Sequence, residues 1–422
     1  MTVETHATGG GFADLVLTDR VATPMYTDPG IFDAEMERIF TRTWVWVAHT
    51  SEIPNTNDFV TSHVGRQPVV VTRDRKGKVH VLVNRCRHRG ATVCEHRKGT
   101  ATSLVCPYHG WGYAQDGSLR GVPYQEGYGE TIDKKALGLK ALKVGEYQGL
   151  IFASFNEDIE PLEDFLGNAK VWIDLFMKQG AGYPIKAMGE HRFRFPGNWK
   201  IQLENTTDAY HFPIVHRPFI ESLDKEAEET FTFLNGAGFV EDLGNGHSVM
   251  VMIPELVDLD ADLDAPIPKR FEALATELAK THTPQEVRRI VRAVGGSGFN
   301  VNIFPNIACS MAFFRALRPV AVNETEIRHI CIGMDGGPDV ANRARMRLHE
   351  HFQGAMGFGS PDDAEAWERV QRGVQGGPDL PILVNRGVGL ETVSSNGLPI
   401  GEVSAETGMR AAYQMWKRMM SA

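Results

Sequence analysis

The strongest constraint on how this chain folds is a repeated Cys/His motif. Cys86 and His88 are separated by one residue, and Cys106 and His109, which follow after 17 intervening residues, are separated by two. Thiolates and imidazoles are the usual ligands of zinc and of iron–sulfur clusters. Two such pairs can meet at one metal centre if each lies on a turn and the chain between them folds back as strands. The motif therefore predicts a β-rich, metal-binding module.

The order of the ligands indicates which metal centre is bound. In a Rieske [2Fe–2S] centre, two histidines replace two cysteines on one of the irons. A structural zinc site is the alternative, but zinc fingers usually place a cysteine pair before a histidine pair. Here cysteine and histidine alternate, and a glycine that suits a tight loop, Gly90 or Gly110, follows each pair. The pattern favours the cluster over zinc.

A second group of candidate ligands lies in the segment NWKIQLENTTDAYHFPIVH. Asp208 precedes His211 by three residues, and His216 follows His211 by five. We expect a helix over residues 198–211, ended or kinked by Pro213, because proline removes a helical hydrogen bond and clashes with the preceding turn. Such a break can bring both imidazoles to one point. Two ordinary histidines on a polar helix face are the alternative, but an electron-transfer site in the same chain favours a metal.

Two histidines need a carboxylate to form the facial triad of non-haem Fe(II) oxygenases. The best distal candidate is Asp363, in the segment SPDDAEAW. Spacing alone, however, favours a helix cap for Asp362 or Asp363, because Ser360, Pro361 and Asp363 match the N-cap, N1 and N3 positions of a helix. The residues by themselves leave both interpretations open.

Taken together, these motifs resemble the catalytic α subunit of bacterial Rieske non-haem iron aromatic-ring-hydroxylating oxygenases, over roughly residues 20–420. The resemblance implies a [2Fe–2S] cluster and a mononuclear Fe(II). It also implies a carboxylate that connects an iron ligand of one subunit to a cluster histidine of its neighbour. The implied residues are Cys86, His88, Cys106 and His109 for the cluster, His211, His216 and Asp363 for the iron, and Asp208 for the bridge.

We expect an α+β fold, in which a Rieske-type β-rich domain is inserted into a catalytic domain of the helix-grip type, an antiparallel sheet plus helices. A hairpin signal at residues 68–84 and a strand at 149–155 support the inserted domain, and Pro161 marks its end. The expected divisions are an N-terminal segment 1–43 that packs on the catalytic domain, a Rieske domain 44–160 and a catalytic domain 161–422.

The resemblance implies a terminal oxygenase that activates O2 and mono- or dihydroxylates an aromatic substrate in bacterial aromatic catabolism. Electrons must come from a separate NAD(P)H-dependent reductase, with or without a ferredoxin. The chain has no G-x-G-x-x-G fingerprint, and Cys94, Cys309 and Cys331 are too scattered for a ferredoxin motif. A small β subunit in an α3β3 assembly is expected, with a trimer required by the bridge.

Composition limits the other possibilities. The 53 acidic and 44 basic residues give a net charge of −9, which argues against nucleic-acid binding. The sequence contains no run of about 18 apolar residues, so we expect no membrane span. Five cysteines, an odd number, indicate a reducing cytoplasm rather than a disulfide framework. The alternatives that remain are a single-component O- or N-demethylating Rieske monooxygenase and a non-catalytic Rieske electron carrier.

The substrate is less constrained by the sequence. An arginine near the iron would favour a carboxylated ring, but Arg315 and Arg318 can equally be structural. Residues near the iron motif, or on the strands expected beside it, are candidates for the pocket wall: Phe212, Ile220, Met252, Asn302 and Phe304.

Overall fold

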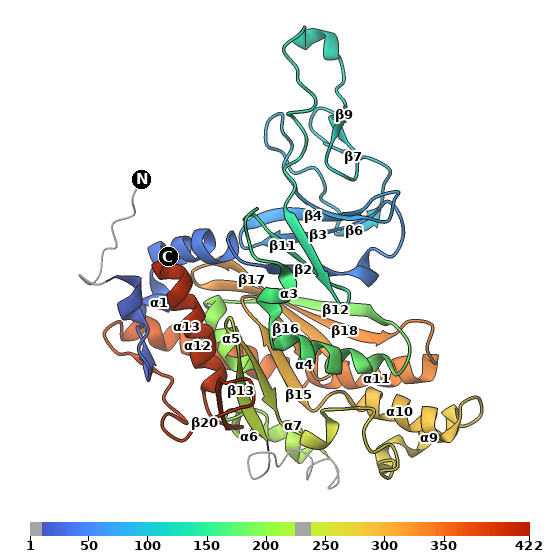
Figure 1. Ribbon diagram of the computed structural model, residues 1–422, viewed down its shortest axis with the longest axis vertical. Helices are drawn as coiled ribbons and strands as arrows, with labels where there is room; N and C mark the ends of the chain where they lie inside the picture. The colour runs from blue at the N-terminus through green and yellow to red at the C-terminus, as the bar shows by residue number, and fades with distance from the viewer. Residues whose placement is uncertain (1–10, 224–237) are drawn as a thin grey trace. The chain divides into compact units, whose positions relative to one another are not determined.

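The computed structural model describes residues 11–223 and 238–422, and the chain divides into two compact units (Figure 1). Phe40–Leu162 forms a β-rich unit, and the chain before and after it forms a sheet–helix unit. The expected α+β class, with a β-rich module inserted into an antiparallel sheet plus helices, is confirmed. Of the expected N-terminal segment, residues 1–10 lie outside the described part.

The β-rich unit contains three small antiparallel sheets, ordered β5-β4-β3-β6, β7-β8-β9 and β10-β11-β2. The expected hairpin is β4–β5, and it turns where the Asp74 carboxylate accepts hydrogen bonds from the backbone N–H groups of Lys76 and Lys78. The strands are β2 (Val45–His49), β3 (Asp58–Val64), β4 (Gln67–Arg73), β5 (Val79–Val83), β6 (Lys98–Thr100), β7 (Leu104–Val105), β8 (Gly112–Tyr113), β9 (Leu119–Gly121), β10 (Lys143–Tyr147) and β11 (Leu150–Ser154).

The sheet–helix unit is built on a nine-stranded antiparallel sheet with the order β12-β18-β17-β16-β15-β14-β13-β21-β20. A separate two-stranded ribbon pairs β1 (Arg20–Val21) with β19 (Ile382–Leu383). The strands of the large sheet are β12 (Ile185–Phe195), β13 (Phe239–Gly244), β14 (His247–Val251), β15 (Phe299–Ile303), β16 (Ile307–Ser310), β17 (Phe313–Ala321), β18 (Glu324–Met334), β20 (Thr392–Val393) and β21 (Pro399–Glu402).

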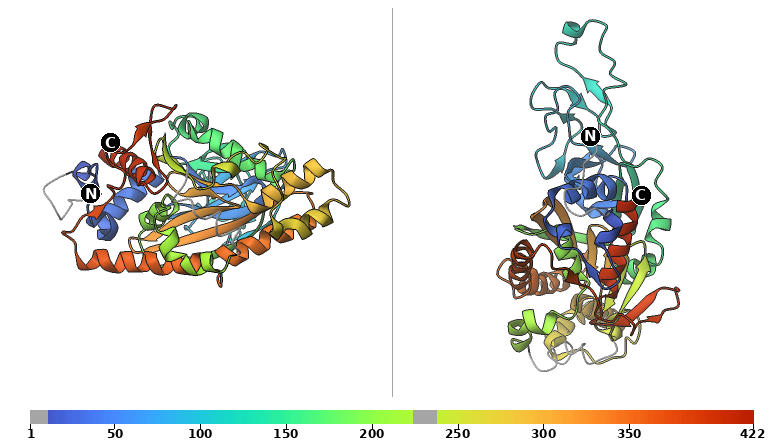
Figure 2. Two further views of the ribbon diagram at one scale, coloured as in Figure 1. Left: turned by 90° about the horizontal axis from the view of Figure 1, so that it is seen from below. Right: turned by 90° about the vertical axis from the view of Figure 1, so that its left-hand side faces the viewer.

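Helices cover both faces of this sheet, with α4 and α11 on opposite sides (Figure 2, left). The short helix α3 (Leu162–Leu166) joins the two units along the chain. The other helices are α1 (Pro24–Thr27), α2 (Pro29–Glu35), α4 (Ala169–Met177), α5 (Trp199–Thr206), α6 (Phe212–Val215), α7 (Arg217–Glu221), α9 (Glu272–Leu278), α10 (Pro284–Gly295), α11 (Asp339–Gln353), α12 (Ser360–Gly376) and α13 (Thr407–Ser421).

The alternation of side chains along the central strands separates a core face from a polar face. In β15, Phe299 packs edge-on against Trp172 of α4, with ring centroids 5.1 Å apart. Because successive residues of a strand point to opposite faces, Asn300 lies on the other face, where it accepts a hydrogen bond from Ser310. On that face Phe313 of β17 packs against His349 of α11. The polar side chains therefore gather between the sheet and α11.

A buried polar cluster fixes the N-terminal segment to the rest of the sheet–helix unit. Glu35 of α2 is fully buried and accepts hydrogen bonds from Lys200 Nζ at 2.6 Å, Trp199 Nε1 at 2.8 Å and Trp416 Nε1 at 2.7 Å. A buried charge that lost these partners would be costly, so the cluster joins α2 firmly to α5 and α13. These are the helices beside the candidate site.

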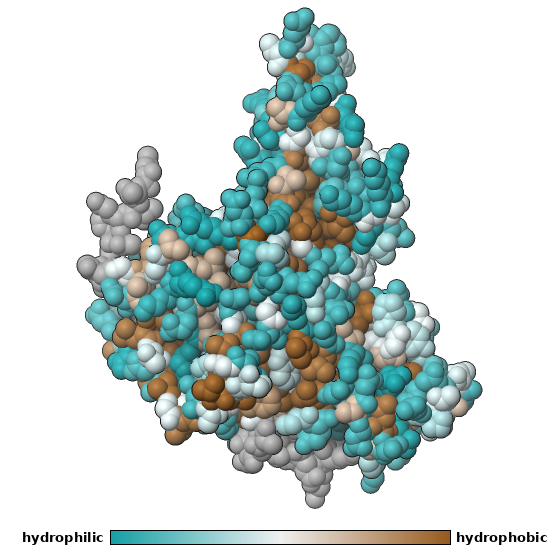
Figure 3. Space-filling model, viewed as in Figure 1, coloured by the Kyte–Doolittle hydropathy of each residue, from teal (hydrophilic) through white to brown (hydrophobic). Residues whose placement is uncertain are grey.

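The surface view in Figure 3 shows a mostly hydrophilic face with scattered hydrophobic patches. Among the described residues, no helix combines the length and the apolar character needed to cross a bilayer.

Candidate iron and cluster sites

The two Cys/His pairs of the β-rich unit lie on loops with the same backbone pattern. In each loop the cysteine N–H donates to a carbonyl five residues ahead, and the glycine N–H donates back to the cysteine carbonyl at 3.0 Å. Gly90 and Gly110 have φ values of +80° and +73°, which only glycine adopts readily. The glycines therefore allow Cys86 and Cys106 to occupy equivalent positions.

These loops bring the four side chains of the motif into one cluster. The rings of His88 and His109 lie 4.5 Å apart, and both cysteines are buried. Burial and the neighbouring Cys86 thiol raise the pKa of Cys106, which shows that the sulfurs lie close together. His88 Nδ1 is buried and has no hydrogen-bond partner within the described part of the chain. Two adjacent thiols and an imidazole nitrogen left without a partner fit a cluster held by cysteine and histidine.

The iron motif of the sheet–helix unit departs from the expected helix over 198–211. Asn198 caps α5, accepting from Lys200 N as expected, but α5 ends at Thr206. Beyond it, Asp208 Oδ1 accepts a hydrogen bond from Tyr210 N at 2.6 Å, an Asx turn that competes with helical hydrogen bonding.

Two short helices follow this turn, and they place the histidines. Pro213 and Pro218 stand in the first turns of α6 and α7, where proline's missing N–H costs nothing. His211 precedes α6 and His216 ends it. Their ring centroids consequently lie only 5.3 Å apart.

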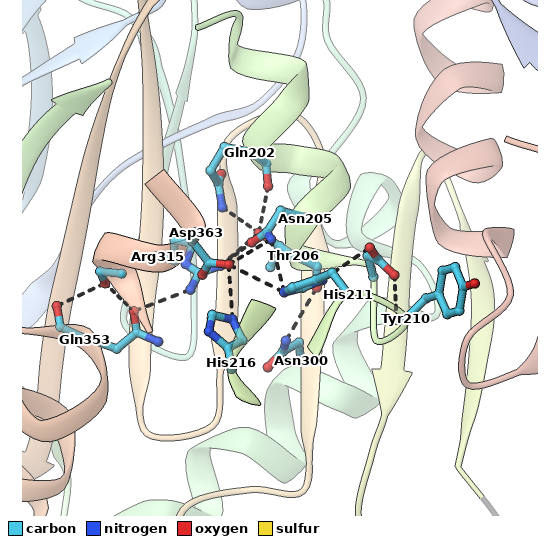
Figure 4. A network of polar contacts seen from close by, with 12 residues as sticks. Gln202, Asn205, Thr206, Tyr210, His211, His216, Asn300, Arg315, Gln353 and Asp363 are labelled. Carbon is cyan, nitrogen blue, oxygen red and sulfur yellow. Dashed lines mark hydrogen bonds and ion pairs between the residues drawn. The ribbon is translucent and has the colours of Figure 1, made fainter. Parts of the chain in front are cut away.

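Asp363, in the first turn of α12, points at both imidazoles (Figure 4). Its Oδ1 lies 3.1 Å from His216 Nε2 and 3.5 Å from His211 Nε2. Two ligand atoms bound about 2.1 Å from one metal at a right angle would be about 3 Å apart. The three side chains therefore fit a 2-His-1-carboxylate metal site, and the separation of their donor atoms, all within 4.8 Å, agrees.

The electrostatics of this group suit a cation. Burial would raise the pKa of Asp363, but the hydrogen bonds and charges of the two histidines outweigh it and hold that pKa far below its usual range. Burial would lower the pKa of His211, yet Asp208 and Asp363 raise it to about 9. A buried carboxylate kept ionised beside two imidazoles is a ready ligand for a divalent cation.

The alternative interpretation of Asp363 as a helix cap is wrong. The helix α12 begins at Ser360 itself, and no side chain caps it. Ser360 Oγ donates to Gln353 Oε1 at 2.9 Å, and Asp363 faces the histidines instead of the backbone N–H groups of its own helix.

A narrow cavity of about 40 Å³ opens beside the three side chains, and an apolar cavity of about 160 Å³ adjoins it across Phe212, Met311 and Phe352. Of the expected pocket residues, Phe212 and Met252 line the narrow cavity, whereas Asn302, Phe304 and Ile220 line neither. The narrow cavity also has polar walls, contributed by Asn205, Asn300, Ser310, Arg315 and Gln353.

Two residues at these sites were not predicted from the sequence. Asn205 Nδ2 lies 3.1 Å from Asp363 Oδ1 and 3.2 Å from His211 Nε2, so this amide can donate to the Asp363 carboxylate and position it beside the histidines. At the cluster loops, Tyr113 Oη lies 3.2 Å from Cys86 Sγ. The aromatic-rich segment YHGWGY could have suggested Tyr113, but nothing distinguishes Asn205 from other polar helix residues.

Comparison with known proteins identifies both units. The model of the Rieske [2Fe–2S] domain matches residues 43–142, and the model of the ring-hydroxylating α subunit catalytic domain matches residues 184–422. The chain belongs to the family of ring-hydroxylating oxygenase α subunits. It is an oxidoreductase with a Rieske [2Fe–2S] cluster and a mononuclear non-haem Fe(II), as the sequence predicts.

Individual relatives agree with this assignment. The chain is 35% identical to the anthranilate 1,2-dioxygenase large subunit of Acinetobacter baylyi, over 87% of this chain and 80% of that protein. It is 31% identical to the toluate 1,2-dioxygenase α subunit of Pseudomonas putida, over 85% and 80% respectively. A naphthalene 1,2-dioxygenase structure with indole bound in its active site superposes with a TM-score of 0.82, at 27% identity and over 98% and 95% of the two chains.

Proposed function

We propose that His211, His216 and Asp363 hold the catalytic iron of this oxygenase. The observation that carries the proposal is the convergence of two imidazoles and one ionised carboxylate on a single cavity. When bound, the iron activates O2 and the cluster supplies electrons. The chain's own side chains orient the iron ligands and form the walls around the aromatic ring. Cys86, His88, Cys106 and His109 are the proposed cluster ligands, supported by their common loop geometry.

We propose that Asp208 carries the connection between subunits. Its Oδ2 lies 3.2 Å from His211 Nδ1, the nitrogen that faces away from Asp363. The Asp208 side chain is 21% exposed, so a second partner can reach the carboxylate from outside. A carboxylate shared between two ligand histidines orients both rings and tunes both metals. This arrangement requires an oligomer, proposed to be a homotrimer, in which each iron receives electrons from a neighbour's cluster.

The remaining partners are proposed from the same family assignment. Relatives named as large or α subunits support a small β subunit in an α3β3 assembly, and a separate NAD(P)H-dependent reductase, with or without a ferredoxin, would supply electrons. We propose residues 44–160 as the electron-accepting domain, 161–422 as the catalytic domain and 1–43 as a segment belonging to the latter. The boundaries of the compact β-rich unit, Phe40 and Leu162, support these limits. Cys94, Cys309 and Cys331, which are not proposed as cluster ligands, are free thiols, and this suits a cytoplasmic location.

The test is product analysis under ¹⁸O2. The chain, co-produced with its candidate β subunit, is supplied with NADH, a reductase and aromatic substrates. Incorporation of two labelled oxygens into one ring is the expected result. A relative from Sphingobium, 33% identical, is named an N,N-dimethyl phenylurea N-demethylase α subunit. Release of formaldehyde from N-methylated substrates without ring oxidation would therefore show that the enzyme is a demethylase and not a ring dihydroxylase.

A further inference from the structure

The iron cavity contains a buried cation that the proposed iron chemistry does not use. Arg315 of β17 is 6% exposed and lines the narrow cavity beside Asp363 and Phe352. A buried guanidinium remains charged and requires hydrogen-bond acceptors, either from the protein or from a bound ligand.

The acceptors around Arg315 are neutral, and most of them are distant. Nε donates to His329 Nε2 at 3.0 Å. The two terminal nitrogens have only longer contacts: Nη1 lies 3.5 Å from Asn205 Oδ1 and 3.4 Å from Thr206 Oγ1, and Nη2 lies 3.5 Å from Gln353 Oε1. N–H···O bonds are normally 2.7–3.2 Å long, and those to a carboxylate are shorter still. Both terminal nitrogens can therefore make better bonds than they have.

Other arginines of the same sheet region have shorter hydrogen bonds at their terminal nitrogens, although Arg318 Nε and Arg345 Nε are buried without a partner among the described residues. Arg318, three residues along β17, donates to Glu326 Oε2 at 3.0 Å. Arg328 of β18 donates to Glu190 Oε2 at 2.6 Å. The fully buried Arg345 donates to backbone carbonyls, and it lines neither cavity beside the iron ligands. Arg315 differs from all three because it lines the iron cavity, where its charge interacts with the Asp363 carboxylate. It also differs from Arg318 and Arg328 because, within the described chain, no carboxylate accepts a hydrogen bond from it.

The surroundings of Arg315 match one kind of ligand. Phe212, Met252 and Phe352 provide apolar walls for a flat ring, and the guanidinium presents two terminal nitrogens as a fork that fits a carboxylate. With Fe(II) held by one carboxylate and two neutral imidazoles, the metal group would have a net positive charge. An anionic substituent would therefore be attracted by both the metal group and Arg315.

We propose that Arg315 binds the carboxylate of an aromatic acid and so makes aromatic acids the preferred substrates. This inference rests on the proposed function, because it places the ring in the cavity of the iron ligands. The relatives named for anthranilate, toluate and 2-halobenzoate act on rings that carry a carboxylate, in agreement with this role.

The test compares binding of benzoate with binding of benzamide, which has the same shape and no charge. Dissociation constants are measured by calorimetry on anaerobic, iron-loaded holoenzyme, so that the readout is independent of turnover. Wild type should bind benzoate at least about tenfold more tightly than benzamide, the effect expected for charge-assisted hydrogen bonds. Arg315→Gln should remove most of this preference and leave only the share that comes from the metal group, with benzamide binding within about twofold of wild type.

Two variants serve as controls. Arg315→Lys keeps the charge without the fork and should retain part of the preference. Arg318→Gln removes a neighbouring arginine of the same strand and should retain all of it. Equal binding of the two ligands by wild type, no saturable benzoate binding, or a preference as large in Arg315→Gln as in wild type would overturn the proposal.

Iron content, measured on every sample, separates this inference from the proposed function. A wild-type protein that is folded and does not bind iron would refute the iron site, whereas full iron content without a benzoate preference would refute only the role of Arg315. If Arg315→Gln does not fold, the ligand pair on wild type and Arg315→Lys still decides the question.

Discussion

Replacement of Asp208 by asparagine tests separately how this carboxylate affects iron affinity and how it affects electron transfer. Asparagine keeps the shape of the side chain and can still accept the hydrogen bond from Tyr210 N, so the turn after α5 should persist. The charge opposite His211 Nδ1 is lost. Removing a carboxylate that orients a metal-bound histidine usually weakens metal binding by about 10- to 100-fold. At 3.2 Å and 21% exposure, this contact belongs at the weak end of that range. We expect a tenfold loss of iron affinity, or about 1.4 kcal/mol.

Electron transfer should change far more than iron binding. If Asp208 connects His211 to the cluster of a neighbouring subunit, the variant loaded with saturating Fe(II) should reduce its cluster normally and fail to pass the electron on. Stopped-flow absorbance, after mixing the reduced protein with O2 and substrate, follows oxidation of the cluster. A rate close to that of wild type, with iron bound, would refute the bridging role. Asp362→Asn, a carboxylate change one residue from the proposed ligand Asp363, is the matched control and should leave both quantities unchanged.

Three further predictions follow from the packing and the electrostatics. Asp363→Ala should lose the mononuclear iron and retain the cluster, and Asp362→Ala should keep both, as measured by iron content; equal losses in the two variants would contradict the ligand assignment. Glu35→Gln should leave the Lys200 charge buried without its partner and destabilise the fold by about 3–5 kcal/mol, measured by denaturant unfolding. A change below about 1 kcal/mol would show that the hydrogen bonds of Glu35 do not stabilise the fold. Burial, opposed by hydrogen bonds from two tyrosines, raises the pKa of Glu204 from 4.5 to about 7, so the folded state should lose about 3 kcal/mol of stability as pH rises from 4.5 to above 7. Glu204→Gln should remove that loss, and an unchanged pH profile of unfolding would contradict it.

The β-rich unit and its ligand loops were accessible to prediction because their determinants are local. Gly90, two residues after His88, and Gly110, directly after His109, indicate loops with positive φ. The turn residues between β4 and β5 likewise predict the hairpin. The α+β class and the family motifs were predictable for the same reason. Such signals need no knowledge of tertiary contacts.

The helix expected over 198–211 was wrong beyond Thr206 because a side chain overrode helix propensity. Asp208 uses its carboxylate for the Asx turn to Tyr210, and periodicity does not reveal that choice. The position of Asp363 was equally ambiguous, since cap and ligand have the same sequence signature. Only the packing of α12 against α5 and α6 turns this side chain towards the histidines.

The sequence does not show which residues from distant elements meet at the iron cavity. Asn205 comes from α5, Arg315 from β17 and Gln353 from α11, and long-range register places all three around one cavity. The sequence could name Arg315 as a candidate but could not distinguish it from Arg318. Their contacts in the folded chain distinguish them, because Arg318 donates a hydrogen bond to Glu326 and Arg315 lines the iron cavity.

The central claim is that one chain carries both a Rieske cluster and a separate catalytic iron. Its most direct test is EPR spectroscopy with iron quantification on anaerobically purified protein reduced with dithionite. The expected result is a rhombic Rieske signal and about three irons per chain, of which Asp363→Ala loses about one. A protein with full zinc occupancy and no signal would contradict the cluster. A Rieske signal with about two irons per chain, unchanged in Asp363→Ala and after Fe(II) reconstitution, would contradict the catalytic iron.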